Sequence, residues 1–220
     1  MLKADLHIHT DRSPDSLITS TKLVARCLDR GINCLAVADH NSIEGALAVQ
    51  SIAPFLVIVA AEVRTSQGEI IGLFLKEAIP PGLSPQETVR RIKEQGGLVC
   101  LPHPFDRMRR EPLRSAARER ILSEIDVVEA FNSRTTFAGD NAQARRFAEA
   151  NGLAMSAGSD AHSLWEVGSA YVEMAEFETP LEFLEALRRG WIVGHRSVPV
   201  VHLMSTWAKL RHRGKARQNR

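Results

Sequence analysis

Short apolar runs alternate with segments of helical periodicity along most of the chain. Apolar residues that recur every three or four positions indicate amphipathic helices, whereas short runs rich in β-branched residues indicate buried strands. The first pattern predicts helices at residues 21–30, 43–50, 84–95, 141–150 and 181–189. The second pattern predicts strands at residues 3–9, 34–38, 55–60, 70–75, 98–101, 127–130, 154–156 and 170–174.

Boundary residues support this division. Gly31 ends the first helix, and Ser84-Pro85-Gln86-Glu87 combines an N-cap serine, a proline at the first helical position and a capping-box glutamate. Strands that alternate with helices favour parallel βα units. We therefore predict an α/β fold whose strands form a closed or distorted barrel in preference to an open sheet.

Length and composition set the number of domains. With 220 residues, of which 44% are hydrophobic and 25% charged, the chain can bury one sizeable core. We predict a single domain at residues 1–198, followed by a C-terminal helix and basic tail at residues 199–220. The apolar runs are far shorter than the roughly 20 residues that span a membrane, so we expect a soluble protein that does not associate with membranes. Functional-looking residues begin at Asp5 and His7, so we expect no secretory signal.

Cysteines and charge add two expectations. Cys27, Cys34 and Cys100 lie in apolar surroundings without CxxC spacing, so they are predicted to be buried thiols of a cytoplasmic protein. The formal net charge of +2 creates no global field for nucleic acid, although basic residues crowd at 107–120 and 209–220. The oligomeric state is left open.

Imidazole and carboxylate side chains follow the predicted strands repeatedly. In a parallel barrel the C-terminal ends of the strands form a single face, so these side chains are expected to meet there. His7 and His9 are two residues apart on one strand, so both point the same way while Leu6 and Ile8 point the other way. Asp160 and His162 repeat this spacing after a glycine, although a helix cap is the alternative for Asp160.

Three more segments extend the candidate site. His40 is predicted to bind metal, while its neighbour Asp39 either orients it or faces the substrate. Glu62 ends an apolar strand and can bridge two ions, with an exposed loop position as the alternative. His103 lies between two prolines that fix its direction, although a structural histidine is the alternative. His202 and His212 lie outside the pattern and are interpreted as structural or surface residues.

The kinds of ligand indicate the kinds of metal. Mixed imidazole and carboxylate ligands without cysteine suit zinc, iron or manganese, with magnesium as a further candidate. The lack of thiolates argues against a closed structural zinc site, so the cluster is predicted to be catalytic.

A resemblance to a known family covers the same residues. Asp5-Leu6-His7-Ile8-His9-Thr10, followed by Ser13-Pro14-Asp15-Ser16, closely resembles the first motif of the PHP (polymerase and histidinol phosphatase) family. The resemblance continues through Ala38-Asp39-His40-Asn41, Glu62, Pro102-His103-Pro104 and Gly158-Ser159-Asp160-Ala161-His162. It implies a distorted, TIM-like (β/α)7 barrel whose C-terminal rim holds two or three divalent ions.

The resemblance also implies a ligand set. By motif position it consists of His7, His9, Asp15, His40, Glu62, His103, Asp160 and His162. Many family members have a histidine that enters the strand after the bridging glutamate, where this chain has Glu69. A carboxylate can also bind metal there, so Glu69 joins the candidates and the occupancy of the third ion is left open.

These residues together predict a hydrolase that cleaves phosphate esters. Paired ions are expected to lower the pKa of a bound water from about 15.7 towards 7, producing a hydroxide for in-line attack. Catalytic roles are assigned to Asp39, Glu62 and His162. Candidates for binding the substrate phosphate are Arg64, Arg107, Arg109, Arg134 and His195, with an ordinary surface role as the alternative for each.

The expected substrate is a small phosphomonoester or a nucleotide, because the chain shows no second domain to hold a polymer. The alternative is a nuclease or cyclic phosphodiesterase, in which residues 107–120 would follow a phosphate backbone. Two further alternatives are a non-catalytic module that binds metal or a partner, and a hydrolase of amides or lactones.

Overall fold

A computed structural model describes residues 1–109 and 112–197. These residues form one sheet with the strand order β7-β6-β5-β4-β3-β2-β1-β8-β9. The strands are β1 (Leu2–Ile8), β2 (Cys34–Val37), β3 (Leu56–Thr65), β4 (Gly68–Leu73), β5 (Leu98–Leu101), β6 (Val127–Asn132), β7 (Ala154–Gly158), β8 (Ala170–Met174) and β9 (Trp191–Gly194). The helices are α1 (Ser20–Arg30), α2 (Glu44–Gln50), α3 (Pro85–Glu94), α4 (Ser115–Arg120), the 3₁₀ turn η1 (Leu122–Glu124), α5 (Ala138–Ala150) and α6 (Pro180–Arg188).

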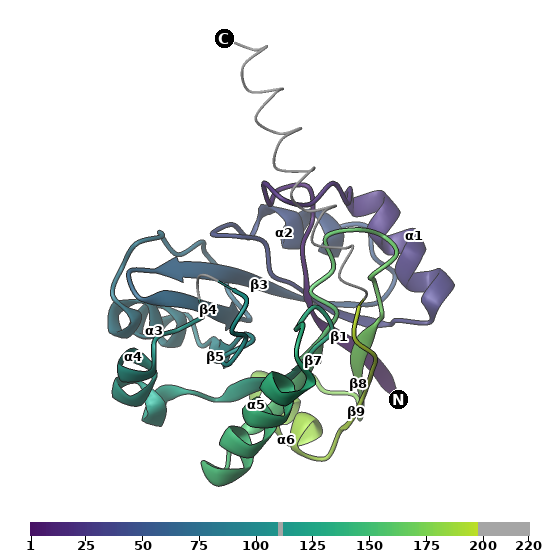
Figure 1. Ribbon diagram of the computed structural model, residues 1–220. Helices are drawn as coiled ribbons and strands as arrows, with labels where there is room; N and C mark the ends of the chain where they lie inside the picture. Colours follow the sequence, from purple (N-terminus) through teal and green to yellow (C-terminus); the bar gives the residue numbers. More distant parts are fainter. Residues whose placement is uncertain (110–111, 198–220) are drawn as a thin grey trace.

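The sheet curves into a nearly closed barrel (Figure 1). Strands β1 to β7 form its wall, and the segment after β7 returns to the end of β1. Ile8 there forms a parallel bridge with Ala161, the His9 amide donates to the Ala161 carbonyl at 3.0 Å, and the Asp160 amide donates to the His7 carbonyl at 2.7 Å. The first half of β1 pairs instead with antiparallel β8, so β8 and β9 extend the sheet beyond the closure.

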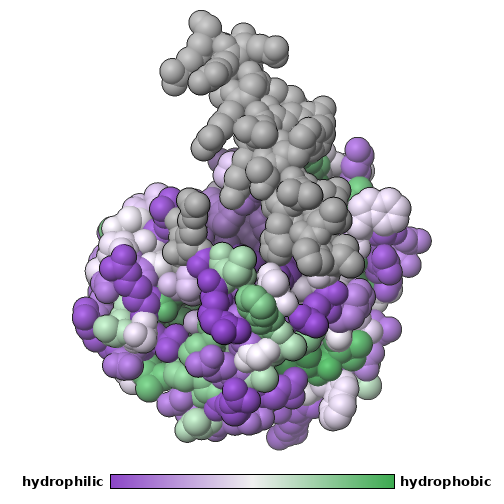
Figure 2. Space-filling model, in the orientation of Figure 1, coloured by the Kyte–Doolittle hydropathy of each residue, from purple (hydrophilic) through white to green (hydrophobic). Residues whose placement is uncertain are grey.

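Alternation along the strands creates two buried layers. One cluster joins Leu35, Val37 and Val99 to apolar residues of α1, α3 and α5, and therefore lies between the sheet and its outer helices. The other joins Ala36 and Ile58 to α6, whose Phe183 is fully buried, and therefore fills the inside of the barrel. The face shown in Figure 2 is mainly hydrophilic, with apolar side chains in small separate patches.

The α/β barrel expected from the sequence is confirmed, and all eight predicted strands and all five predicted helices are present. The expectation of parallel βα units is wrong at β8, which pairs antiparallel with β1, and at β4, which pairs antiparallel with both β3 and β5. Only Ser66 and Gln67 separate β3 from β4, and so short a link permits a hairpin but no crossover. Helix α4, η1 and β9 were not predicted. The C-terminal helix and tail expected at 199–220 lie outside the described residues.

The boundary signals act as expected. The Ser84 hydroxyl accepts from the Glu87 amide at 3.1 Å, and Gly31 adopts a left-handed φ of 68° after α1. Within the described part of the chain, every helix is too short or too polar to cross a bilayer.

Candidate metal centre

The predicted ligands gather at one rim of the barrel. His7 lies near the end of β1 and His9 directly follows it, His40 follows β2, His103 follows β5, and Asp160 with His162 follows β7. Because β4 runs antiparallel, it begins where its neighbours end, and this direction brings Glu69 to the same rim. All nine predicted ligands are buried apart from His40, which is partly exposed.

Ligand atoms within 4.8 Å of one another form four overlapping groups among the described residues. The groups are His7, His9 and Asp160; His7, Glu62 and His103; His9, His40 and His162; and His40, Glu62 and Glu69. Eight of the nine predicted ligands are thus brought together, all except Asp15.

The first pair of histidines provides a test of whether a cation fits. His7 Nδ1 lies 3.0 Å from Glu129 Oε1, and His9 Nδ1 lies 3.2 Å from the Ser13 hydroxyl, which itself donates to Asp39 at 2.6 Å. Both Nδ1 atoms are therefore donors, and both Nε2 atoms present lone pairs across a gap of 3.1 Å. Two nitrogens that share an ion at about 2.1 Å lie roughly 3.0–3.4 Å apart. The pair therefore fits a shared cation, with a proton as the competing occupant.

The carboxylates explain how strongly the proton competes. Burial opposes a charged imidazole, but Glu129 and Glu62 outweigh it and raise the pKa of His7 to about 10. Burial, together with the neighbouring imidazoles of His162 and His40, instead holds the pKa of His9 well below its usual value. One imidazole of the pair is therefore charged and the other neutral near pH 7.

Two carboxylate oxygens point into the centre. Asp160 Oδ1 lies 3.4 Å from His9 Nε2, 3.5 Å from His162 Nδ1 and 3.9 Å from His7 Nε2. Glu62 Oε2 lies 3.1 Å from His40 Nδ1, while its Oε1 lies 2.9 Å from His103 Nε2. Within the described residues, neither Asp160 Oδ1 nor Glu62 Oε2 accepts a hydrogen bond. A buried carboxylate oxygen without a donor is costly, and a bound cation would remove that cost.

Asp15 connects the last two histidines. Its carboxylate oxygens lie 3.4 Å from His40 Nε2 and 3.4 Å from His162 Nε2. Burial again opposes charge, but Asp15 and Glu62 raise the pKa of His40 to about 10. Burial and the guanidinium of Arg134 lower the pKa of His162 to about 3, so His162 is a neutral donor of a lone pair.

Glu69 completes this side of the centre. Its Oε2 lies 4.0 Å from His103 Nε2, and its side chain is almost fully buried. Its carboxylate also belongs to the group of possible ligands that contains His40 and Glu62.

Unusual backbone angles mark the same rim. Among the described non-glycine residues, positive φ occurs at Asn41, Phe74, His103 and Asp160. Two of these are predicted ligands, and a third follows His40. Such angles cost energy and persist where surrounding contacts enforce them, as is common at functional sites.

Sequence reasoning missed Glu129, a buried carboxylate in the middle of β6. Besides His7 Nδ1, it accepts from the His103 amide at 2.7 Å and from Asn132 Nδ2 at 3.0 Å. Asn132 in turn donates to Asp160 at 3.1 Å. One carboxylate therefore orients three ligand-bearing segments.

Asp39 supports the loop that follows β1. Its carboxylate accepts from the Thr10 amide at 2.7 Å and from the Thr10 and Ser13 hydroxyls at 2.6 Å each. It therefore holds the loop after β1 and, through the Ser13 hydroxyl, reaches both the His9 ring and the His40 backbone amide. A catalytic role for Asp39 stays a prediction.

One expectation about β1 is wrong. Leu6 and Ile8 pack in the two different apolar clusters, because a register shift between Asp5 and Ile8 interrupts the alternation of the strand. His7 and His9 nevertheless converge. Asp5 fixes this region by accepting from the Ser159 amide at 2.8 Å and the Gly168 amide at 3.0 Å.

The predicted phosphate-binding residues differ in position. Arg109 donates to Asp160 and lies 3.4 Å from Asp106. Arg134 is buried, with Nη1 2.6 Å from His162 Nδ1 and Nε 3.2 Å from Glu166. Arg107 pairs with Asp140 at 3.0 Å, and Arg64 is exposed beside the start of β4. The predicted role of each stays a prediction.

His195 lies further along the chain, in the segment after β9. Its side chain is exposed, and its backbone amide and carbonyl bond Ser169 and Ser133. Its phosphate-binding role likewise stays a prediction.

Comparisons with known proteins agree with this architecture. Residues 5–73 match the PHP domain, and residues 138–192 match the PHP-associated family. An uncharacterized protein from Methanocaldococcus jannaschii is 39% identical over 200 residues, which cover 85% of this chain and 79% of the relative.

Solved structures share the fold at lower identity. A two-domain protein from Bacteroides vulgatus, which contains a predicted PHP-like metal-dependent phosphoesterase, has a TM-score of 0.73 and 19% identity over 88% of this chain and 65% of its own. Endonuclease Q, solved with a 27-mer duplex carrying an abasic lesion at the active site, has a TM-score of 0.62 and 14% identity over 86% of this chain and 56% of its own. This chain thus spans about two thirds or less of either protein.

Proposed function

The chain belongs to the PHP family, and we propose that it hydrolyses phosphate esters with divalent ions held at the barrel rim. The substrate that we propose is a small phosphomonoester or a nucleotide. The observation that carries the proposal is Asp160 Oδ1, a buried carboxylate oxygen without a hydrogen-bond donor in the described residues, which faces three imidazoles. Oxygen and imidazole ligands in this arrangement suit zinc, manganese or iron.

The ligand set divides into sites around Glu62. One ion would be held by His7, His9 and Asp160, a second by His103 and Glu69, and a third by Asp15, His40 and His162. Glu62 lies within 4 Å of a nitrogen of His7, His9, His40 and His103, so it can be shared between sites. Burial opposes its charge, but the surrounding imidazoles keep its pKa well below the usual value, so Glu62 is ionised and able to bridge.

The chemistry of the proposed reaction divides between ions and protein. Divalent ions in such a site acidify water and neutralise charge on phosphate oxygens. Glu129 holds His7 with Nε2 directed at the centre, and Asp39 does the same for His9 through Ser13. Arg134 keeps His162 neutral, while Arg109 places a partly exposed guanidinium against Asp160. Arg109 is thus the positive group best placed to meet a phosphate at the rim.

The proposal is tested by purifying the chain without chelator and measuring bound metal. A generic phosphomonoester and a generic phosphodiester are then assayed with manganese, beside His7→Ala and Asp160→Ala. Glu185→Gln, an exposed substitution on α6, is the matched control. We expect two or more ions per chain, and hydrolysis that falls at least a hundredfold in both site variants but not in the control. Less than one ion per chain after reconstitution, with no hydrolysis, would indicate a module that binds without catalysis.

A nuclease is the second candidate, and a specific observation favours it. Arg107, Arg109, Arg114 and Arg118 lie within one short segment beside the rim. Preferential cleavage of the diester, together with binding to single-stranded DNA or RNA that weakens steeply with salt, would select this candidate.

A further inference from the structure

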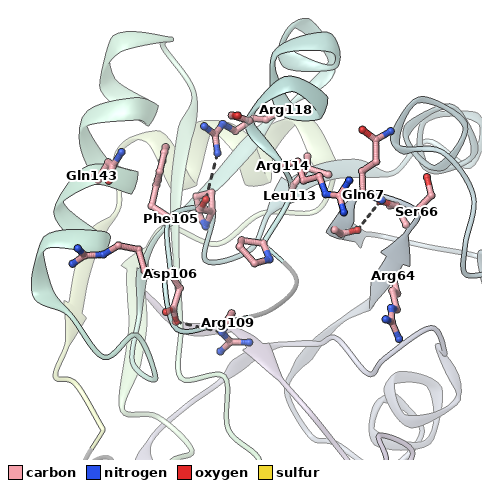
Figure 3. Close-up of a pocket in the computed structure, with 16 residues that line it drawn as sticks. Arg64, Ser66, Gln67, Phe105, Asp106, Arg109, Leu113, Arg114, Arg118 and Gln143 are labelled. Carbon is pink, nitrogen blue, oxygen red and sulfur yellow. Dashed lines mark hydrogen bonds and ion pairs between the residues drawn. The ribbon is translucent and has the colours of Figure 1, made fainter.

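The loop between β7 and β8 borders the metal centre on the side of α1. It carries Asp160 and His162, and it runs beside α1 in Figure 1. The pocket in Figure 3 borders the centre elsewhere, between the β3–β4 hairpin and the segment after β5, and no residue of this loop lines it. The loop therefore presents a surface of its own, on which Trp165 is the large exposed side chain.

Trp165 is exposed on a backbone that is held in place. Its side chain is 75% exposed, although tryptophan usually buries most of its area. The next residue, Glu166, is buried, and its Oε2 accepts from the His162 amide at 3.2 Å, the Ser163 amide at 3.0 Å and the Ser163 hydroxyl at 2.8 Å. An indole on such a backbone has little freedom left to lose when a ligand binds.

Arg26 of α1 supports one face of the indole. Its Cζ lies 5.7 Å from the centre of the Trp165 ring, an attractive arrangement of a cation over an aromatic face. The guanidinium is itself fixed, because Nε donates to the Leu164 carbonyl at 2.9 Å and Nη1 donates to Asp29 at 2.7 Å. With one face supported, the exposed area of the side chain leaves the opposite face open to a flat ligand.

The indole lies near the metal centre along the chain. His162 and Trp165 are three residues apart, so their Cα atoms are separated by at most about 11 Å. The Glu166 amide also donates to the Ser163 carbonyl at 3.1 Å, which turns the loop back on itself. A substrate with its phosphate at the ions can therefore bring an attached ring to Trp165.

Positive charge accompanies the indole along α1. Lys22 and Arg30 are exposed and lie one helical turn to either side of Arg26, so three cations share one face of the helix, which has Asp29 as its single carboxylate. Cations beside an exposed aromatic ring are the combination that binds single strands of nucleic acid, because phosphates meet the charge while bases stack on the ring.

The chain contains a second indole with the same exposure but different surroundings. Trp191 in β9 is also 75% exposed, and it lies opposite Glu173 of β8. Within the described residues, no lysine or arginine is recorded over its ring, and it is far along the chain from every predicted ligand. Trp191 therefore serves as a matched control for Trp165.

We propose that Trp165 stacks on a nucleobase of the substrate, while the scissile phosphate lies at the metal centre. The inference rests on the proposed function and narrows its substrate class to nucleotides and single nucleic acid strands. Every base has a π face, so the contact favours ligands with a base and selects no sequence. The base can belong to a mononucleotide or to a neighbouring residue of a strand, since both present the same ring.

The first experiment measures binding in chelator, where the proposed hydrolysis does not proceed. The affinity for a short, fluorescently labelled thymidylate strand is measured by polarisation, with unlabelled thymidine monophosphate and inorganic polyphosphate as competitors. We expect Trp165→Ala to weaken binding of the strand at least fivefold, because stacking on the indole is lost, and Trp165→Phe to retain most of the affinity. Trp191→Ala should bind as the parent does.

The competitors identify where the stacked base belongs. Competition by thymidine monophosphate that weakens in Trp165→Ala would assign the base to the nucleotide itself, whereas a loss confined to the strand would assign it to a neighbouring residue. Polyphosphate has no base, so its affinity should be unchanged in Trp165→Ala. Strand binding that is equal in Trp165→Ala and Trp191→Ala, or polyphosphate binding that falls as much as strand binding, would overturn the proposal.

The second experiment measures selectivity in the manganese-loaded protein. We expect kcat/KM for thymidine monophosphate, or for a 5′-phosphorylated strand, to exceed that for deoxyribose 5-phosphate at least tenfold. Trp165→Ala should reduce this ratio to below about threefold, and Trp191→Ala should leave it unchanged. Hydrolysis without the preference, or a preference that survives Trp165→Ala, would overturn the stacking site. Trp165-dependent binding without hydrolysis of any ester would instead reject the proposed phosphoesterase function and leave the indole as a surface that binds bases.

Discussion

Glu129 illustrates how a side chain outside the ligand set can control the centre. Its carboxylate contacts the His7 ring, the His103 amide and Asn132, and Asn132 reaches Asp160. All of these groups are buried, so none can exchange its partner for water without a rearrangement. The orientation of His7 therefore depends on a single oxygen of Glu129.

Replacing Glu129 should weaken metal binding more strongly than it weakens folding. Glu129→Gln keeps an acceptor of the same length but loses the charge, so we expect metal affinity to fall roughly tenfold, and up to about a hundredfold for Glu129→Ala. The measurement is competition for manganese or zinc against a chromogenic chelator. Glu149→Gln, on the exposed side of α5, is the control and should bind normally. If Glu129→Ala bound metal as the parent does, the orienting role would be wrong.

The same residues show what could be predicted at this scale. His7, His9, His40 and His103 follow strands in the sequence, and chain direction alone brings such positions to one rim. Glu129 lies inside the strand Val127–Asn132, and its position relative to His7 depends on how β6, β7 and β1 curve together. Its signal in the sequence was a charge within an apolar run, since such charges are rarely buried without partners.

At the scale of elements, prediction succeeded where burial determines the pattern. The strands Cys34–Val37 and Leu98–Leu101 are fully buried and appear as uninterrupted apolar runs. In α4 (Ser115–Arg120) only Ala117 is buried, so no apolar stripe marks the helix. β9 (Trp191–Gly194) is short and partly exposed. The antiparallel direction of β4 follows from the short link before it. The turn signal at Gln67-Gly68 predicted the position of this link, but a hairpin was not inferred from it.

Burial within helices and strands also determines how the cysteines react. Cys27, Cys34 and Cys100 lie inside α1, β2 and β5, each at most 4% exposed. Burial raises the pKa of the Cys34 thiol to about 12 and raises those of Cys27 and Cys100 as well. A raised pKa leaves the unreactive thiol form in place at pH 8, because the thiolate is the nucleophile.

We therefore expect iodoacetamide at pH 8 to modify none of the three cysteines in the folded protein and all three in guanidinium, as counted by intact mass. Rapid labelling of Cys34 in the folded state would mean that β2 opens readily. Labelling of Cys100 would mean the same for β5.

At the scale of the whole molecule, the centre connects parts of the chain that are far apart in sequence. The ligands run from His7 to His162 and come from the ends of β1, β2, β5 and β7 and from β3 and β4. Ions bound there would join most of the barrel wall at one rim, including the closure between β1 and the segment after β7. The unfolded chain has no preformed site, so metal binding and barrel stability are linked.

Metal removal should therefore lower the melting temperature. At a free ion concentration of about 100 times Kd, binding adds about 2.7 kcal/mol per site to the free energy of unfolding. For a domain of this size that corresponds to a rise in Tm of roughly 5–11 °C per site, measured with manganese against excess chelator. His7→Ala and Asp160→Ala should lose most of this rise, because each removes a ligand of the same group. A rise that persists in both variants would place the stabilising ion elsewhere, whereas a rise confined to the parent would show that the rim itself holds the barrel closed.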